Sequence, residues 1–221
     1  MLRRLFLLAG LASFITACAP AGLNPGPVGV RQQAVRPAPR TAAALFPVQQ
    51  GYHWDYAVTV APVMDPDDED HGTYSLEIDK AVPGPAGTRL ELRGLSGFSH
   101  SYSFPTLIQG PDGIQLRDMT FLGLGADEVQ GLGIDFIRLP LQPGQRWEDE
   151  NWIGKVKGFE TVSVPAGNFQ AWRIEVIGTY DQAYTTVGDY WIAPGQGVVK
   201  AVYTIPDFHI EMLLTRAGLR K

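Results

Sequence analysis

Residues 164–176, VPAGNFQAWRIEV, carry the pattern that decides the fold. A Pro-Ala-Gly turn signal comes first, and the apolar residues Trp172, Ile174 and Val176 then alternate with charged residues. Successive side chains of a strand point to opposite faces of a sheet, so a period of two predicts a β-strand with one buried face.

The same alternation recurs along the chain, and turn signals separate the alternating segments. The alternating segments are residues 54–60, 74–79, 89–93, 172–176 and 208–212, and the turns are 83–85, 110–113, 165–167 and 194–197. Short strands with frequent Gly and Pro turns indicate a mainly antiparallel all-β fold. Only residues 124–137 offer a short helix or a loop crossing.

Composition and charge narrow the class of protein. Hydrophobic residues make up 45% of the 221 residues and charged residues 19%, which is typical of a folded domain. The net charge of −5 argues against nucleic acid as a partner. The single cysteine excludes an internal disulfide and a Cys-based zinc site. Residues 45–221 have the size of one domain.

The N-terminus predicts export and lipidation. Residues 1–17 combine two arginines with an apolar stretch, Leu5–Ile15, that is too short to span a bilayer, as in a signal peptide. The segment Ile15-Thr16-Ala17-Cys18 resembles the lipobox of bacterial lipoproteins. This resemblance implies a diacylglyceryl thioether on Cys18 and an acylated amine carrying a chain such as palmitate. In a bacterium with two membranes it also implies sorting to the outer membrane, because Ala19 and not Asp follows the cysteine. An ordinary secretory signal with a chance cysteine is the alternative.

A basic tether, residues 18–44, follows the signal. It is rich in Pro, Ala and Gly, has no acidic residue, and carries Arg31, Arg36 and Arg40, whereas residues 45–221 have 13 basic and 23 acidic residues, a net charge of −10. This composition predicts a flexible or partly extended segment. The arginines suit an anionic membrane or cell-wall surface, and simple solubility of a Pro- and Ala-rich spacer is the alternative.

An internal repeat is also predicted. Residues 47–54 and 140–147 share the pattern P-[VL]-Q-x-G-x-x-W, and Leu107-Ile108 before a Gly turn resembles Trp191-Ile192 before another. We infer two similar halves, residues 46–120 and 139–216, within one sheet system. Coincidence among Gly- and Pro-rich turns is the alternative.

The second half carries a family resemblance. Residues 164–175, with Val-Pro-Ala-Gly and Ile-Glu, and residues 190–200, with Tyr-Trp-Ile-Ala-Pro-Gly, resemble the DUF3108-type families of bacterial envelope proteins. These are similar in outline to LolA/LolB-like carriers. The resemblance implies a curved open sheet or half-barrel and supplies no catalytic residues. A β-sandwich is the alternative fold.

Candidate chemical sites are few, and we predict no enzyme and no cofactor. Ser99 and His100 are neighbours on an alternating segment, so their side chains would point to opposite faces and could not pair. Asp65, Asp67 and Glu69 are a weak candidate for calcium, because oxygen ligands at alternate positions can wrap the ion. The candidate ligand-binding aromatics are Trp54, Trp147, Trp152, Trp172 and Trp191.

These observations predict a lipid-anchored envelope protein that acts as a non-enzymatic binding or scaffold module. A carrier of a lipid or another hydrophobic ligand is the alternative, and an envelope hydrolase is less favoured. The expected partners are the membrane, through the lipid, and an envelope protein, the cell wall or a lipid ligand. A carrier needs an accessible apolar concave face, whereas a scaffold needs a closed core and an exposed edge or patch.

Overall fold

A computed structural model describes residues 44–96, 106–117, 134–149, 152–180 and 184–220. The chain divides into two units, Met1–Arg36 and Pro37–Lys221, and all the described residues belong to the second. No helix in this described part is long and apolar enough to cross a membrane.

The described residues form one antiparallel sheet of twelve strands in the order β6-β5-β4-β3-β2-β1-β12-β11-β10-β9-β8-β7. The strands are β1 (Tyr52–Pro62), β2 (Asp70–Gly84), β3 (Gly87–Ser96), β4 (Thr106–Gly110), β5 (Gly113–Arg117), β6 (Ile134–Arg138), β7 (Arg146–Asp149), β8 (Trp152–Val164), β9 (Gly167–Tyr180), β10 (Tyr184–Ala193), β11 (Gly197–Ile205) and β12 (Phe208–Leu219). The predicted all-β antiparallel fold is confirmed. The alternative of a β-sandwich is wrong, because all twelve strands belong to one sheet.

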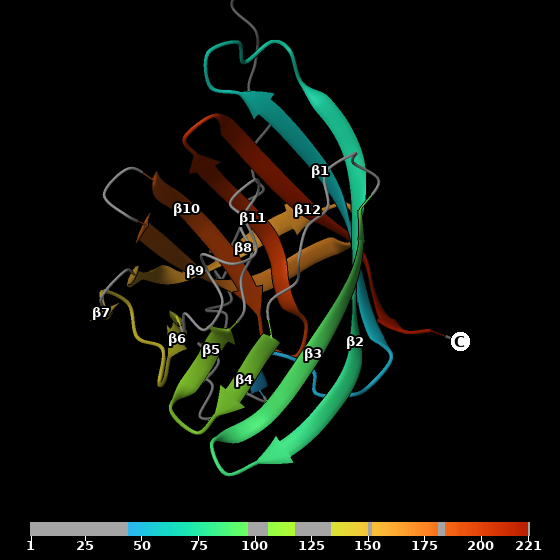
Figure 1. Cartoon of the computed structure of the whole chain (residues 1–221), viewed down its shortest axis with the longest axis vertical. Helices are drawn as coiled ribbons and strands as arrows, with labels where there is room; N and C mark the ends of the chain where they lie inside the picture. The colour runs from blue at the N-terminus through green and yellow to red at the C-terminus, as the bar shows by residue number, and fades with distance from the viewer. Residues whose placement is uncertain (1–43, 97–105, 118–133, 150–151, 181–183, 221) are drawn as a thin grey trace, which may run out of the picture. The chain divides into compact units, whose positions relative to one another are not determined.

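The sheet curls until its two edge strands, β6 and β7, lie close together (Figure 1). Side chains bridge the two edges. The Trp147 indole N–H donates to the Asp135 carbonyl over 2.6 Å, and the Asp135 N–H donates to the Asp149 carboxylate over 3.2 Å. The Gln145 amide donates to the Arg138 carbonyl over 3.3 Å. The result is a nearly closed barrel with a seam, where side chains satisfy backbone groups that a neighbouring strand would otherwise bind.

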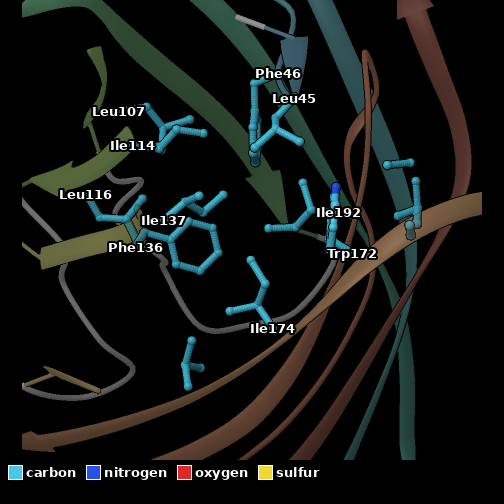
Figure 2. Close-up of a cluster of buried hydrophobic side chains, with 14 of the residues drawn as sticks. Leu45, Phe46, Leu107, Ile114, Leu116, Phe136, Ile137, Trp172, Ile174 and Ile192 are labelled. Atoms are coloured by element: carbon cyan, nitrogen blue, oxygen red, sulfur yellow. The ribbon is translucent and has the colours of Figure 1, made fainter. Parts of the chain in front are cut away.

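The predicted alternation places the core on the concave face. On β1, Trp54, Tyr56 and Val58 are buried, while Asp55 and Ala57 between them, and Thr59 after them, are more exposed. Figure 2 shows apolar side chains from β4, β5 and β6 directed toward side chains from β9 and β10. Twelve large side chains are at most 2% exposed: Leu45, Ile78, Leu90, Ile114, Ile137, Leu141, Trp152, Val156, Ile174, Val176, Ile192 and Leu214.

The segment before β1 helps to fill one end of the barrel. The N–H groups of Gly195 and Gly197, in the β10–β11 turn, donate to the carbonyls of Ala44 and Leu45, each over 2.9 Å. Leu45 and Phe46 are buried and point toward the core cluster (Figure 2). The Phe46 ring lies against Gly197, whose φ is +82°, so only glycine fits this turn readily.

Local features recur in the two halves of the sheet. Gly51 and Gly144 have φ of 78° and 83°, and each precedes a strand that carries a buried Trp. The N–H of Gly51 donates to Ile78, and that of Gly144 donates to Val156, both over 2.8 Å. These parallels agree with the shared P-[VL]-Q-x-G-x-x-W pattern, and the internal repeat itself stays a prediction.

Two details of the sequence interpretation are corrected. Residues 134–137, which were expected in a short helix or loop crossing, lie in strand β6, and the other residues of 124–137 lie outside the described residues. The match of Leu107-Ile108 to Trp191-Ile192 is displaced by one residue, because Leu107 is buried whereas Trp191 is not. A register irregularity between Trp191 and Ile192 in the pairing of β10 with β11 accompanies this displacement.

Candidate functional site

Two of the candidate tryptophans, Trp54 and Trp147, have their indole N–H groups bound to backbone carbonyls. Trp54 donates to Gln196 in the β10–β11 turn over 2.5 Å, and Trp147 donates across the seam as described above. Both side chains are 3% exposed. Burial and these bonds explain both residues as structural anchors, since a buried indole needs an acceptor for its N–H.

Trp152, Trp172 and Gln109 are different, because their buried polar atoms have no hydrogen-bond partner in the protein. They are 2%, 6% and 6% exposed. Trp172 belongs to the cluster of Figure 2, and Gln109 lies on the same face of β4 as the core residue Leu107. An unpaired buried polar group costs free energy, so water or a bound molecule is the expected partner. No motif or spacing in the sequence pointed to Gln109.

Trp191 lies half-buried at the centre of a polar cluster on β8 to β11. Its indole N–H donates to Glu160 over 2.7 Å, and Arg173 and Lys200 lie 5.1 and 5.4 Å from the ring centroid. Both cations are directly paired with Trp191 in the sheet register. They are also paired with acids, Arg173 with Asp189 and Lys200 with Glu211. The cluster is therefore a network of cation–π contacts and ion pairs, in which the buried Nε of Arg173 and one carboxylate oxygen of Asp189 have no hydrogen-bond partner.

A second polar group lies on β1, β2 and β12. Asp55 accepts hydrogen bonds from Ser75 and from Arg216, each over 2.7 Å, and its carboxylate lies 3.9 Å from the Nε2 atom of His53. Burial alone would raise the pKa of Asp55, but the bonds from Ser75 and Arg216 outweigh it and hold that pKa below its ordinary value. His53 is 5% exposed, and neither ring nitrogen has a hydrogen-bond partner.

This group does not have the geometry of a hydrolase. A nucleophilic serine needs a base within hydrogen-bond reach of its hydroxyl. Here the Ser75 hydroxyl donates to the Asp55 carboxylate and not to the His53 imidazole. The imidazole therefore does not occupy the position from which it could act as the base for Ser75. Ser99 and His100 lie outside the described residues, as does Cys18.

An apolar patch, Val63, Met64 and Phe208, lies at the end of β1 opposite to Leu45. Met64 is 95% exposed, Val63 43% and Phe208 38%. The β1–β2 connection and the β11–β12 turn meet here, because the Val63 N–H donates to the Asp207 carbonyl over 2.9 Å and Phe208 pairs with Pro62. We call this surface the rim patch; the β1–β2 connection is the long loop at the top of Figure 1.

The calcium candidate lies beside the rim patch. In the described residues, no group of three or more His, Cys, Asp or Glu side chains is placed to hold a metal ion, and Asp65, Asp67 and Glu69 form no such group. Glu69 instead lies 3.5 Å from His71. The geometry gives the calcium site no support, and it stays an untested prediction.

The comparisons with known proteins give the fold and no family. No family model matches the chain, so the DUF3108-type resemblance is not confirmed, and no curated protein matches it. A structure from Parabacteroides distasonis ATCC 8503, provisionally described as a lipoprotein, is similar with a TM-score of 0.53 at 12% identity, over 79% of this chain and 98% of that one. At this identity the likeness shows the fold alone.

A second similar structure comes from Bacteroides fragilis NCTC 9343 and is described, also provisionally, as an exported protein with a YmcC-like fold. Its TM-score is 0.48 at 15% identity, again over 79% of this chain and 98% of that one.

Proposed function

We propose that this chain is a lipid-anchored protein of the bacterial cell envelope whose β-domain is a non-enzymatic binding module. The anchor is proposed from Cys18 at the end of a lipobox-like segment and from the basic tether behind it. The description of the Parabacteroides structure as a lipoprotein agrees with this location. Two or more acyl chains on one residue would hold the protein stably on a membrane.

The observation that carries the binding role is the closed core. Side chains from both halves of the sheet fill the concave face, and Leu45 and Phe46 add to them, so the large core residues have almost no exposed surface. A carrier that exchanges its ligand needs an accessible apolar face. A filled interior instead favours recognition through the outer surface and the loops.

The absence of catalysis is also part of the proposal. In the described part of the chain, the Ser75–Asp55–His53 group has the wrong order for a nucleophile and its base, and the ions around Trp191 neutralise one another. Neither group presents an activated side chain to a substrate.

Replacing the lipidated residue tests the anchor. Cys18→Ser removes the thiol that would carry the diacylglyceryl group, so the protein should move from the membrane fraction to the soluble fraction and lose incorporation of labelled palmitate. Flotation of separated inner and outer membranes, with the unchanged chain as the control, tests the outer-membrane expectation. Continued membrane association of Cys18→Ser after a high-salt wash would contradict lipid anchoring.

A second candidate function, carriage of an apolar ligand, is favoured by Gln109, Trp152 and Trp172. Each of these buried polar groups lacks a partner, so an amphipathic molecule with a hydrogen-bond acceptor that reached any one of them inside the apolar core would satisfy it. Native mass spectrometry of residues 19–221 should then show an added mass that disappears on denaturation, and Gln109→Leu should reduce the occupied fraction. A bare monomer mass in every preparation would exclude this function in favour of the binding module.

A further inference from the structure

The rim patch is exposed to a degree that its local structure does not require. Turns are ordinarily built from Gly, Pro, Asn, Asp and Ser, yet Met64 projects from the β1–β2 connection almost fully into water. Burying a Met side chain is more favourable than leaving it exposed to water. Val63 and Phe208 extend the same patch from two connections held together by a backbone hydrogen bond. A contiguous exposed group of this kind marks a contact surface more often than a single exposed residue does.

Unpaired negative charge surrounds the rim patch. Residues 62–72 contain five acidic side chains and residues 204–210 contain one, with no Lys or Arg in either segment. Among these six acidic residues, all of which the structure describes, Glu69 alone forms an ion pair, with His71. On the neighbouring strands the acids Asp55, Glu77 and Glu211 are each paired with an Arg or Lys.

This negative charge distinguishes between the kinds of partner that could bind the rim patch. An anionic lipid surface or a nucleic acid would be repelled by six negative charges. A second copy of the same patch would bring like charges together, which costs free energy. A protein surface with an apolar recess ringed by Lys and Arg is complementary to both the shape and the charge.

We propose that the rim patch is a docking site for a partner protein whose contact surface is an apolar recess flanked by basic residues. Met64 is the central anchor, because a flexible thioether side chain adapts to a recess, and the acidic residues steer the encounter. The patch lies at the end of β1 opposite to Ala44 and Leu45, with which the described part of the chain begins.

A photo-crosslinking residue placed at Met64 in the full chain in living cells tests the site. The matched control is the same residue at Val187, which is also apolar and 46% exposed but lies on β10. We expect an adduct with one protein from Met64 and not from Val187. No adduct, an equal adduct at both positions, or an adduct only with a second copy of this chain would overturn the proposal.

The protein identified in that adduct is then purified and titrated against residues 19–221 by calorimetry. Met64→Glu should weaken binding by about tenfold or more, whereas Val187→Glu should change it by less than about twofold. Raising the salt concentration from about 0.05 to 0.5 M should also weaken binding, because screening reduces charge steering. Equal affinity for both variants would overturn the proposal.

Two further measurements separate the alternatives. Vesicles of phosphatidylethanolamine and phosphatidylglycerol, mixed with residues 19–221, should not bind the protein; binding that Met64→Glu abolishes would make the patch a membrane contact and overturn the proposal. Fractionation of Cys18→Ser and titration of the soluble domain are independent readouts. A failure of anchoring and a failure of docking are therefore distinguishable.

Discussion

At the scale of single residues, the most informative position is Gly154 on β8. A Cβ atom built there would lie 2.2 Å from two ring atoms of Trp147, which is far inside van der Waals contact. The ring of Trp147 is held by its bond across the seam, so it cannot move away without cost. The glycine is thus required by the approach of an aromatic ring and not by its own backbone conformation.

Gly154→Ala is therefore expected to destabilise the fold by about 1–3 kcal/mol, the usual cost of overpacking a filled core. The matched control is Gly158→Ala on the same strand, where a new Cβ meets nothing within 4 Å. That variant should stay within about 1 kcal/mol of the unchanged protein. Urea denaturation of both measures the difference, and similar midpoints would contradict the packing of Trp147 on Gly154.

Asp55 gives the fold a specific dependence on acid. Its pKa is lowered in the folded state, so its charge stabilises the fold above the ordinary aspartate pKa of 3.8 and this stabilisation is lost as the pH falls through the folded value. Asp55→Asn should be less stable than the unchanged protein at neutral pH, and the difference should shrink below about pH 4.

Urea titrations at neutral pH and near pH 3 measure this effect. The control is Glu91→Gln, because Glu91 forms a surface pair with Lys80 and such pairs contribute little. A constant difference between Asp55→Asn and the unchanged protein across this range would show that the carboxylate charge is not the stabilising feature.

At the scale of elements, the seam between β6 and β7 is where the sheet is held most weakly. β6 has five residues and β7 has four, and the bonds between them come from side chains of Trp147, Asp149 and Gln145. Elsewhere, neighbouring strands share ladders, as along the whole length of β1 with β12. We expect opening of the barrel to begin at this seam.

Trp147→Phe tests the seam, because it removes the indole N–H while keeping an aromatic ring. It should cost about 0.5–1.5 kcal/mol and speed amide exchange in β6. Trp172→Phe is the matched control: it loses a comparable volume, but its N–H has no partner. Equal effects of the two substitutions on β6 exchange would contradict a role for the Trp147 hydrogen bond in closing the seam.

The sequence predicted the elements well where a local pattern produces them. The alternation at Trp172, Ile174 and Val176 identified β9, because one face of that strand is buried from Trp172 to Gly178. It failed at residues 134–137, since a strand of five residues with Ile137 and Phe136 both buried has no clear period of two. The seam could not be predicted either, because Trp147 and Asp135 meet only through closure of the whole sheet.

The candidate site, like the strands, could be predicted from the sequence only in part. The tryptophans were visible in the sequence, but their roles depend on partners distant in the chain, such as Gln196 for Trp54. The rim patch could not be predicted from the sequence, because Met64 and Phe208 are about 140 residues apart in the chain. Neither residue alone indicates an apolar patch. Only the pairing of Pro62 with Phe208 brings them together.

At the scale of the whole molecule, the two predicted halves depend on each other. Trp54 and Tyr56 of the first half donate to carbonyls of Gln196 and Val198 in the second half, over 2.5 and 2.8 Å. β1 and β12 form the longest pairing between the halves, and the core cluster draws side chains from both. Each half alone would expose the apolar face that the other covers.

We therefore expect residues 19–138 and 139–221, expressed separately, to show no cooperative thermal transition by circular dichroism. Mixing the two fragments should restore one transition, because the strand pairing and the core burial return together. The complete residues 19–221 serve as the control and should unfold in a single step. A cooperative transition in either fragment alone would mean that half a sheet can bury its own apolar face, and the repeat would then be an independently folding unit and not half of one core.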